Sequence, residues 1–186
     1  MVATQKYIRK VNMTSMLEKS EIEQLNKALP VIMAIWFALI CSLAVYVGVA
    51  KFMEDKLPSM EEGFPLATMN TIFSGLAVVI LIAAHFIRKT MLNPARTSVS
   101  MMGAASSGPA QHPAAAKYMV AMIVSLALSE SVGVCGLVLF ILGRETSTLY
   151  AFMALSAVAM FYFRPKKEEL MDLALEMKMQ GSGRRG

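Results

Sequence analysis

The stretch that decides the fold is Tyr118–Gly143, which reads YMVAMIVSLALSESVGVCGLVLFILG. Lys117 and Arg144 flank it, and it is long enough to cross the hydrocarbon core of a bilayer as a helix. Its single charge-capable residue, Glu130, lies almost at the midpoint. An ionised, unpaired carboxylate at that depth would cost at least about 2.5–3.5 kcal/mol. We therefore expect Glu130 to be protonated, to bind a cation, or to face protein or water.

The composition as a whole is that of a membrane protein. Of the 186 residues, 56% are hydrophobic and only 17% are charged, and the mean hydropathy is +0.53. These values predict an integral membrane protein surrounded by the lipid bilayer rather than a soluble domain. The net charge of +5 lies in loops and flanks, without a basic stripe interleaved with aromatics, so no nucleic-acid partner is expected.

Four apolar runs predict a transmembrane domain over residues 28–163. The expected spans are about 28–50, 64–87, 118–143 and 147–163. The last is short, but aromatic residues at both ends suit the membrane interfaces. The fold class is therefore all-α, a four-span transmembrane helical bundle with short cytoplasmic amphipathic helices at both ends.

The segments outside the spans are polar. Residues 1–27 form an expected amphipathic segment that Ser15 and Glu18 cap as a capping box, and residues 90–116 form an expected flexible loop rich in Ser, Ala, Gly and Pro. The tail, 164–186, contains an expected helix with apolar residues on one face: Leu170, Leu173, Ala174 and Met177. Lys and Arg concentrate in these three segments, which predicts that both termini are cytoplasmic, in a bacterial cytoplasmic (inner) membrane.

The surroundings of Glu130 contain hydroxyls but no counter-cation. Lys and Arg are absent from all four predicted spans, so desolvation favours the neutral acid unless a small cation or water balances the charge. Serines expected near the same depth are Ser42, Ser74 and Ser156, beside Ser129 and Ser131 on the same helix. Such a ring would hold a proton or coordinate Na⁺. Serine is also common at helix contacts in membranes, so a structural cluster is an equal interpretation.

One side of the same helix carries small residues. Ser125, Ser129, Gly133 and Gly136 recur at spacings of three and four. Such a stripe allows another helix to approach closely. We expect tight packing there, either within the chain or between copies, with Glu130 facing protein beside it.

Two stretches resemble a known family. Residues 127–139, ALSESVGVCGLVL, are similar to the outer, carboxylate-bearing helix of the c-subunit (proteolipid) of rotary ATP synthases. Residues 111–117, QHPAAAK, resemble the polar loop that precedes that helix. The resemblance implies that Glu130 carries H⁺ or Na⁺, with Ser131 as a Na⁺ ligand. It covers about a quarter of the chain, and the family has no counterpart of the first and fourth spans.

Two functions follow from these patterns. The first is ion handling, in which Glu130 binds a proton or Na⁺ with Ser131, Ser129 and Ser74 nearby. The second is a structural or accessory subunit in which a neutral Glu130 packs between helices. In either case we expect a homo-oligomer or a subunit of a larger membrane complex. Catalytic motifs, cofactor motifs and metal-ligand spacings are not present in the sequence, so an enzyme is not expected. The aromatic residues Trp36 and Tyr46 are interpreted as anchors or packing groups.

Overall fold

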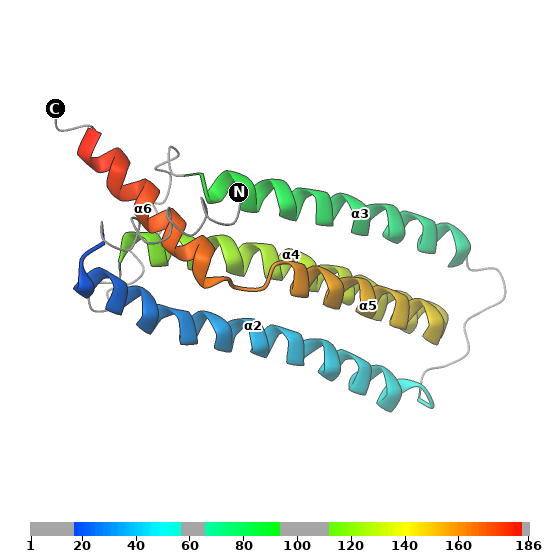
Figure 1. The fold of residues 1–186 in the computed structure, drawn as a ribbon. Coiled ribbons are helices and arrows are strands. Elements are labelled where there is room, and N and C mark those ends of the chain that lie inside the picture. The colour runs from blue at the N-terminus through cyan, green and yellow to red at the C-terminus, as the bar shows by residue number, and fades with distance from the viewer. Residues whose placement is uncertain (1–16, 57–65, 94–111, 184–186) are drawn as a thin grey trace, which may run out of the picture. The chain divides into compact units, whose positions relative to one another are not determined.

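The computed structural model describes residues 17–56, 66–93 and 112–183, and the regular secondary structure within these ranges is helical (Figure 1). The helices are α2 (Lys19–Met53), α3 (Leu66–Met91), α4 (Pro113–Gly143), α5 (Thr146–Tyr162) and α6 (Lys167–Gly183). The expectation of an all-α protein is confirmed for this part of the chain.

Three of these helices are long and apolar enough to cross a membrane. They are α2, α3 and α4, with mean hydropathies of 2.5, 2.1 and 2.0 in their most apolar windows. The bent pair α5 and α6 makes a fourth candidate when it is counted as one broken span. The described part of the chain is thus compatible with a small membrane-embedded protein of three to four spans.

The helix ends differ from the sequence-based boundaries. Residues 19–27 of the N-terminal segment and the first apolar run form one helix of 35 residues, α2, with Pro30 inside it. The last four residues of the expected loop, 113–116, already belong to α4. Pro113 suits the first turn of a helix, because the backbone N–H that proline lacks has no partner within the helix at that position. Ser15 and the loop residues 94–111 lie outside the described residues.

The contacts divide the chain into two compact units. The four-helix unit comprises residues 34–89 and 122–164, and so contains α3, α5 and most of α2 and α4. The end unit comprises residues 1–33, 90–121 and 165–186, and so contains α6 and the beginnings of α2 and α4.

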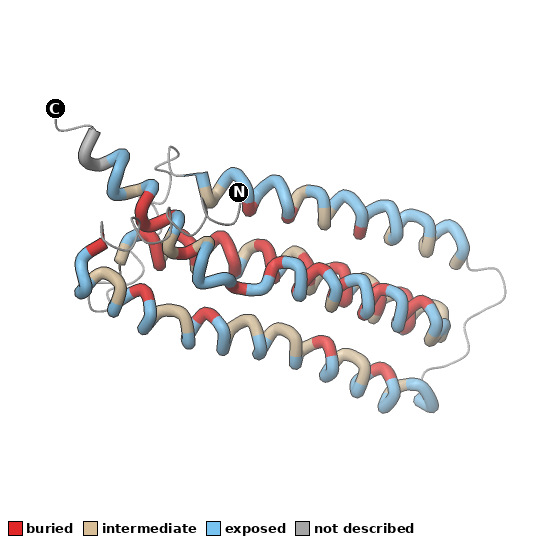
Figure 2. Tube along the Cα trace, viewed as in Figure 1, coloured by how far each residue is buried: buried red, intermediate tan, exposed pale blue. Residues whose placement is uncertain are grey.

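In the four-helix unit, α4 and α5 lie between α2 and α3 (Figure 1). The buried residues concentrate on α4 and α5, whereas α2 and α3 are exposed along most of their length (Figure 2). One buried cluster joins α3, α4 and α5 and consists of Ala77, Val132, Leu139 and Phe152. The outer sides of α2 and α3 present large apolar side chains, among them Phe37, Val45, Ile72, Val79 and Ile82. Exposed faces of this kind suit apolar surroundings rather than water.

The small-residue side of α4 is where α5 comes closest. A Cβ atom added at Gly136 would overlap the Cβ atom of Phe152 and would lie 3.4 Å from the carbonyl oxygen of Leu149. A Cβ atom at Gly133 would lie 2.9 Å from the Leu43 side chain of α2 and 3.4 Å from the Ser156 hydroxyl of α5. The two glycines therefore set how closely α2 and α5 approach α4.

The turn between α4 and α5 is held by its own side chains. Arg144 takes a left-handed backbone conformation with φ 54°, and its N–H donates to the carbonyl oxygen of Phe140. The Glu145 carboxylate accepts hydrogen bonds from the hydroxyls of Thr148 (2.7 Å) and Ser147 (2.9 Å). These two hydrogen bonds, that of Thr148 first, hold the pKa of Glu145 below its ordinary value. The start of α5 is fixed accordingly.

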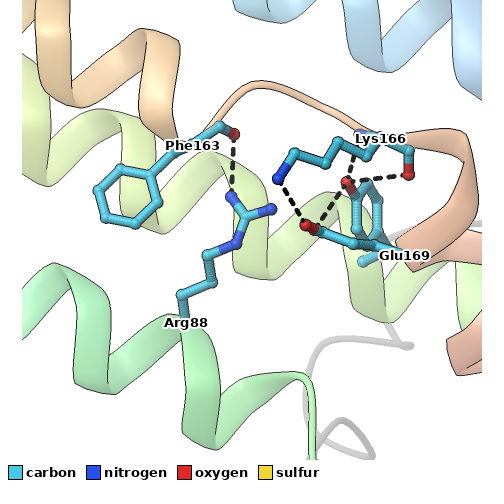
Figure 3. Close-up of polar contacts among 5 residues, drawn as sticks. Arg88, Phe163, Lys166 and Glu169 are labelled. Carbon is cyan, nitrogen blue, oxygen red and sulfur yellow. Dashed lines mark hydrogen bonds and ion pairs between the residues drawn. The ribbon is translucent and has the colours of Figure 1, made fainter. Parts of the chain in front are cut away.

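At the opposite end of α5, a cation from α3 satisfies a terminal carbonyl. The buried Arg88 donates from its guanidinium to the carbonyl oxygen of Phe163 at 2.9 Å and lies over the Phe163 ring (Figure 3). The last carbonyls of a helix lack intrahelical partners and carry partial negative charge, so a cation is favourable there.

In the end unit, α6 is attached to the first turns of α2 and α4. The backbone N–H of Lys166 donates to the Tyr118 hydroxyl at 2.9 Å, and Lys166 pairs with Glu169 at 3.3 Å (Figure 3). Lys178 pairs with Glu21 at 2.8 Å. The apolar face expected for this helix is largely buried, since Leu170, Leu173 and Ala174 are almost inaccessible.

His112 immediately precedes α4 and caps the N-terminus of that helix. Its Nδ1 atom accepts the backbone N–H of Ala114 at 3.3 Å, which is possible only for the neutral imidazole. Burial lowers the pKa of His112, and the Lys178 charge lowers it further, whereas the Glu21 charge acts in the opposite direction. The neutral ring is therefore the form that this helix start selects.

The first prediction concerns the glycine at the close approach. Gly136→Ala is expected to destabilise the folded protein by about 1–3 kcal/mol, because the new methyl group overlaps Phe152. Denaturation in detergent micelles or bicelles, followed by circular dichroism, measures the change. Gly75→Ala is the matched control, since a Cβ atom at Gly75 meets nothing within 4 Å. Equal destabilisation by the two variants would contradict the close packing of α4 and α5.

The second prediction concerns pH. In a His85→Asn background, which leaves His112 as the one imidazole, its ring is expected to titrate below the ordinary value of 6.5 by NMR. Because the pKa is lower folded than unfolded, the stability that neutral His112 contributes is present above pH 6.5 and is lost as the pH falls through the folded pKa. His112→Asn keeps a capping acceptor without a titrating group, so this pH dependence should disappear. A His112 ring that titrates above 6.5 would refute the assignment.

Candidate functional site

The candidate site is the carboxyl group of Glu130, in the middle of α4, and it faces α2. Its Oε1 atom accepts hydrogen bonds from the Ser42 hydroxyl at 2.5 Å and from the Tyr46 hydroxyl at 2.7 Å. Ser42 and Tyr46 are four residues apart on α2 and therefore lie on the same face of that helix. Two hydroxyl groups from one helix thus meet one carboxyl oxygen of another.

Ser42 has a second acceptor within reach. Its hydroxyl lies 2.7 Å from the carbonyl oxygen of Leu39, three residues earlier in α2. A serine hydroxyl carries one hydrogen, so it donates to Leu39 or to Glu130 at any moment. The hydroxyl is therefore placed between two acceptors.

The other carboxyl oxygen, Oε2, differs from Oε1 in its contacts to the described residues. Glu130 is half-buried, and its Oε2 atom has no hydrogen-bond partner among the described residues. The one fully buried side-chain atom without a partner in this part of the chain is Nε of Arg144, so Oε2 is not sealed inside protein. Helix α2 thus bonds one oxygen of the carboxyl group, and the described residues leave the other without a hydrogen bond.

The other serines that the sequence placed near Glu130 bond elsewhere. The Ser129 and Ser131 hydroxyls donate to carbonyl oxygens of their own helix, those of Ser125 (2.9 Å) and Leu128 (2.7 Å). Ser156 donates to the carbonyl oxygen of Ser129 at 2.7 Å and so joins α5 to α4. Ser74 is exposed on α3 and makes no hydrogen bond within the described ranges. Of the expected ring, Ser42 is the member that contacts the carboxyl group.

The small-residue side of α4 and its carboxyl side have different neighbours. Ser125 and Ser129 are completely buried, and Gly133 and Gly136 lie against α5 and one leucine of α2. The stripe is thus covered by helices of the same chain. Glu130 lies beside it and reaches the polar face of α2 instead.

Tyr46 is the site residue that the sequence interpretation missed. In the sequence it is one of several aromatic residues in an apolar helix. Its hydroxyl can be assigned to Glu130 only once it is known that the Ser42 face of α2 packs against α4. The spacing of Ser42 and Tyr46 by one helical turn was the available signal. Nothing in the sequence alone chose α2, rather than α3 or α5, as the neighbour of the carboxyl group.

The charges around the site are sparse. Helix α5 and the apolar part of α2 contain no Asp, Glu, Lys or Arg, and α3 carries its Arg88 and Lys89 in its last turn. Within the described residues, no group of three or more His, Cys, Asp or Glu side chains gathers at one place to hold a metal ion. What the arrangement offers chemically is a carboxyl group with two hydroxyl partners, which suits the binding of a proton.

A second attachment orients α2 next to this site. The Trp36 indole N–H donates to the carbonyl oxygen of Met160 at 3.0 Å, and the indole ring meets the Phe161 ring edge-on with 5.5 Å between centroids. Trp36 lies six residues before Ser42, so the two contacts hold α2 at different heights, one on α5 and one on α4. Together they fix which face of α2 points inward.

The third prediction tests the tyrosine contact. Tyr46→Phe removes one hydroxyl and keeps the ring, and is expected to cost about 0.5–3 kcal/mol of stability, the range for hydrogen bonds to neutral and charged groups. The same change in a Glu130→Leu background should cost much less, because the acceptor is gone. Denaturation in bicelles measures all four proteins of this cycle. Tyr150→Phe, at an exposed position on α5, is the control, and a Tyr46→Phe effect no larger than the control would refute the contact.

No protein family, no curated protein and no solved structure matches this chain, so what can be said of its site comes from its own residues.

Proposed function

We propose that this chain is a small integral membrane protein in which Glu130 binds and releases a proton near the middle of the membrane, as a c-subunit-like proteolipid does. The observation that carries the proposal is the pair of hydroxyl hydrogen bonds to one oxygen of a carboxyl group that sits in the most buried apolar helix. A hydroxyl can accept a hydrogen bond from a neutral carboxyl group and can donate one to a carboxylate, so Glu130 would have partners in both of its forms.

The surrounding hydroxyls support a proton rather than Na⁺ as the ion. Hard cations are bound by several oxygen atoms that converge on one point. Here Ser129 and Ser131 are engaged with carbonyl oxygens of α4, and the two hydroxyls that reach Glu130 contact a single oxygen atom. A set of oxygens arranged around an empty centre is not formed by these residues.

A structural role is the second candidate function, and one observation favours it. The same hydrogen bonds tie α2 to α4, so a permanently neutral Glu130 would serve as a packing group between the two helices. In this case the protein is a structural or accessory subunit of a larger membrane complex. The two functions differ in whether the carboxyl group exchanges its proton.

The proposal includes topology and assembly. Lys and Arg are frequent in residues 1–27 and 164–186, which supports cytoplasmic termini in a bacterial cytoplasmic membrane. The exposed apolar sides of α2 and α3 would face lipid, another copy of the chain or a partner subunit.

The fourth prediction tests the proposed function. A hydrophobic carbodiimide attacks protonated carboxyl groups that are accessible from the bilayer, so it is expected to label Glu130 in native-like membranes. Labelling should fall as the pH rises, and Na⁺ should leave it unchanged. Mass spectrometry of the peptide containing residue 130 measures the extent of labelling at each pH.

Two variants control this experiment. Glu130→Gln should abolish the label, and Glu145→Gln, at an exposed position in the α4–α5 turn, should not change it. If Na⁺ suppresses the labelling, Glu130 binds Na⁺ and the proposal of a proton site is wrong. Absence of labelling at every pH, in protein shown to be folded, would refute proton exchange and favour the structural subunit.

A further inference from the structure

We propose that Ser42 is a two-position hydroxyl that reverses its hydrogen bond when Glu130 gains or loses its proton. In the neutral state the acid donates to Ser42 and Ser42 donates to the Leu39 carbonyl oxygen, and in the ionised state Ser42 donates to the carboxylate. This inference rests on the proposed function, because it gives the exchange of that proton a structural path.

The three hydrogen-bond contacts at the site need three hydrogens, and the two hydroxyl groups supply only two. Three short oxygen–oxygen contacts meet at the site: Ser42 to Leu39 at 2.7 Å, Ser42 to Glu130 at 2.5 Å, and Tyr46 to Glu130 at 2.7 Å. Each needs one hydrogen, and the carbonyl oxygen of Leu39 brings none. Ser42 and Tyr46 bring one hydrogen each. The third has to come from Glu130, so the protonated acid is the state in which all three contacts are hydrogen bonds.

The ionised state is also accommodated without a movement of either helix. When Glu130 loses its proton, the Ser42 hydroxyl turns from the Leu39 carbonyl oxygen to the carboxylate, and Tyr46 continues to donate to the same oxygen. Leu39 then keeps the backbone hydrogen bond of α2. Rotation of one hydroxyl is therefore the only rearrangement that the titration requires.

The second carboxyl oxygen leaves the exchange independent of these two contacts. Because Oε2 has no hydrogen-bond partner in the described part of the chain, a proton can join or leave Glu130 in this proposal without displacing Ser42 or Tyr46. Ser42 is accordingly a positioning residue. It stabilises both forms of the carboxyl group, and the ionised form more strongly, since hydrogen bonds to charged groups are the stronger ones.

The groups that face Glu130 do not offer another explanation for a pH response. Tyr46 is the titratable group that reaches it from α2. Helix α5 contributes no Asp, Glu, Lys or Arg. On α3 the titratable and charged residues are His85, whose ring lies beside that of Tyr162, and Arg88 and Lys89 in the last turn, where Arg88 is bonded to Phe163. On α4 itself, the nearest ionisable group is the Cys135 thiol, more than one turn away.

The test compares Ser42→Ala with Ser42→Thr. The alanine variant loses the hydroxyl, so the pH midpoint of carbodiimide labelling at Glu130 is expected to rise by about one unit, a tenfold change in proton concentration. The threonine variant keeps the hydroxyl and should return the midpoint towards that of the parent protein. Ser74→Ala, at the exposed serine of α3, is the matched control and should leave the midpoint unchanged.

Infrared difference spectroscopy, parent protein minus Glu130→Gln, gives a second readout that does not depend on labelling. A band of the neutral acid is expected, and Ser42→Ala should shift it to higher frequency, because the acid no longer donates to Ser42. An unchanged midpoint and band in Ser42→Ala would overturn the inference while the pH-dependent labelling of the parent protein upheld the proposed function. Absence of the acid band at every pH would overturn the inference as well, and absence of labelling in folded parent protein would refute the proposed function together with the inference that rests on it.

Discussion

The structure depends on one constraint, which is that a carboxyl group within an apolar helix has to find its hydrogen-bond partners inside the protein. Water is scarce in such surroundings, and an unsatisfied polar group there costs several kcal/mol. Glu130 meets this constraint through Ser42 and Tyr46 of α2. The rotation of α2 about its own axis is thereby fixed, because a quarter turn of the helix would move both hydroxyls away from the carboxyl group. A polar contact thus specifies an arrangement that apolar side chains alone would leave loose.

Helix α4 packs closely against α5 on one side and makes polar contacts to α2 on another. Its small residues allow α5 to approach closely, through the Gly136–Phe152 contact and the hydrogen bond from Ser156 to the carbonyl oxygen of Ser129. Its carboxyl side faces α2, where Ser42 and Tyr46 both donate to the same carboxyl oxygen. Close helix packing and the hydrogen-bonded carboxyl group thus occupy separate sides of α4.

Much of the fold follows from the sequence, and the details of the site do not. Hydropathy predicts apolar helices, because an apolar run within a membrane has to satisfy its backbone hydrogen bonds internally. The regular secondary structure in the described part of the chain is accordingly helical. Helix ends were less predictable, as Pro113 shows, since a proline can begin a helix as well as interrupt a chain. Ser42 was among the expected partners of Glu130, whereas the contact from Tyr46 was not expected and Ser74 lies exposed on α3. A nearly uniform apolar helix carries no periodic signal that tells its neighbours apart.

The length of α5 has a consequence for the surrounding lipid. With 17 residues it rises about 25 Å, which is less than the roughly 30 Å of a typical hydrocarbon core, whereas α2 with 35 residues exceeds it. The Arg88 contact to Phe163 and the Glu145 contacts to Ser147 and Thr148 place polar groups at both ends of α5. If α5 crosses by itself, these ends cannot sink inward, so the lipid next to Leu155 and Val158 has to be compressed. In that case the bilayer would be thinner beside α5 than beside α2.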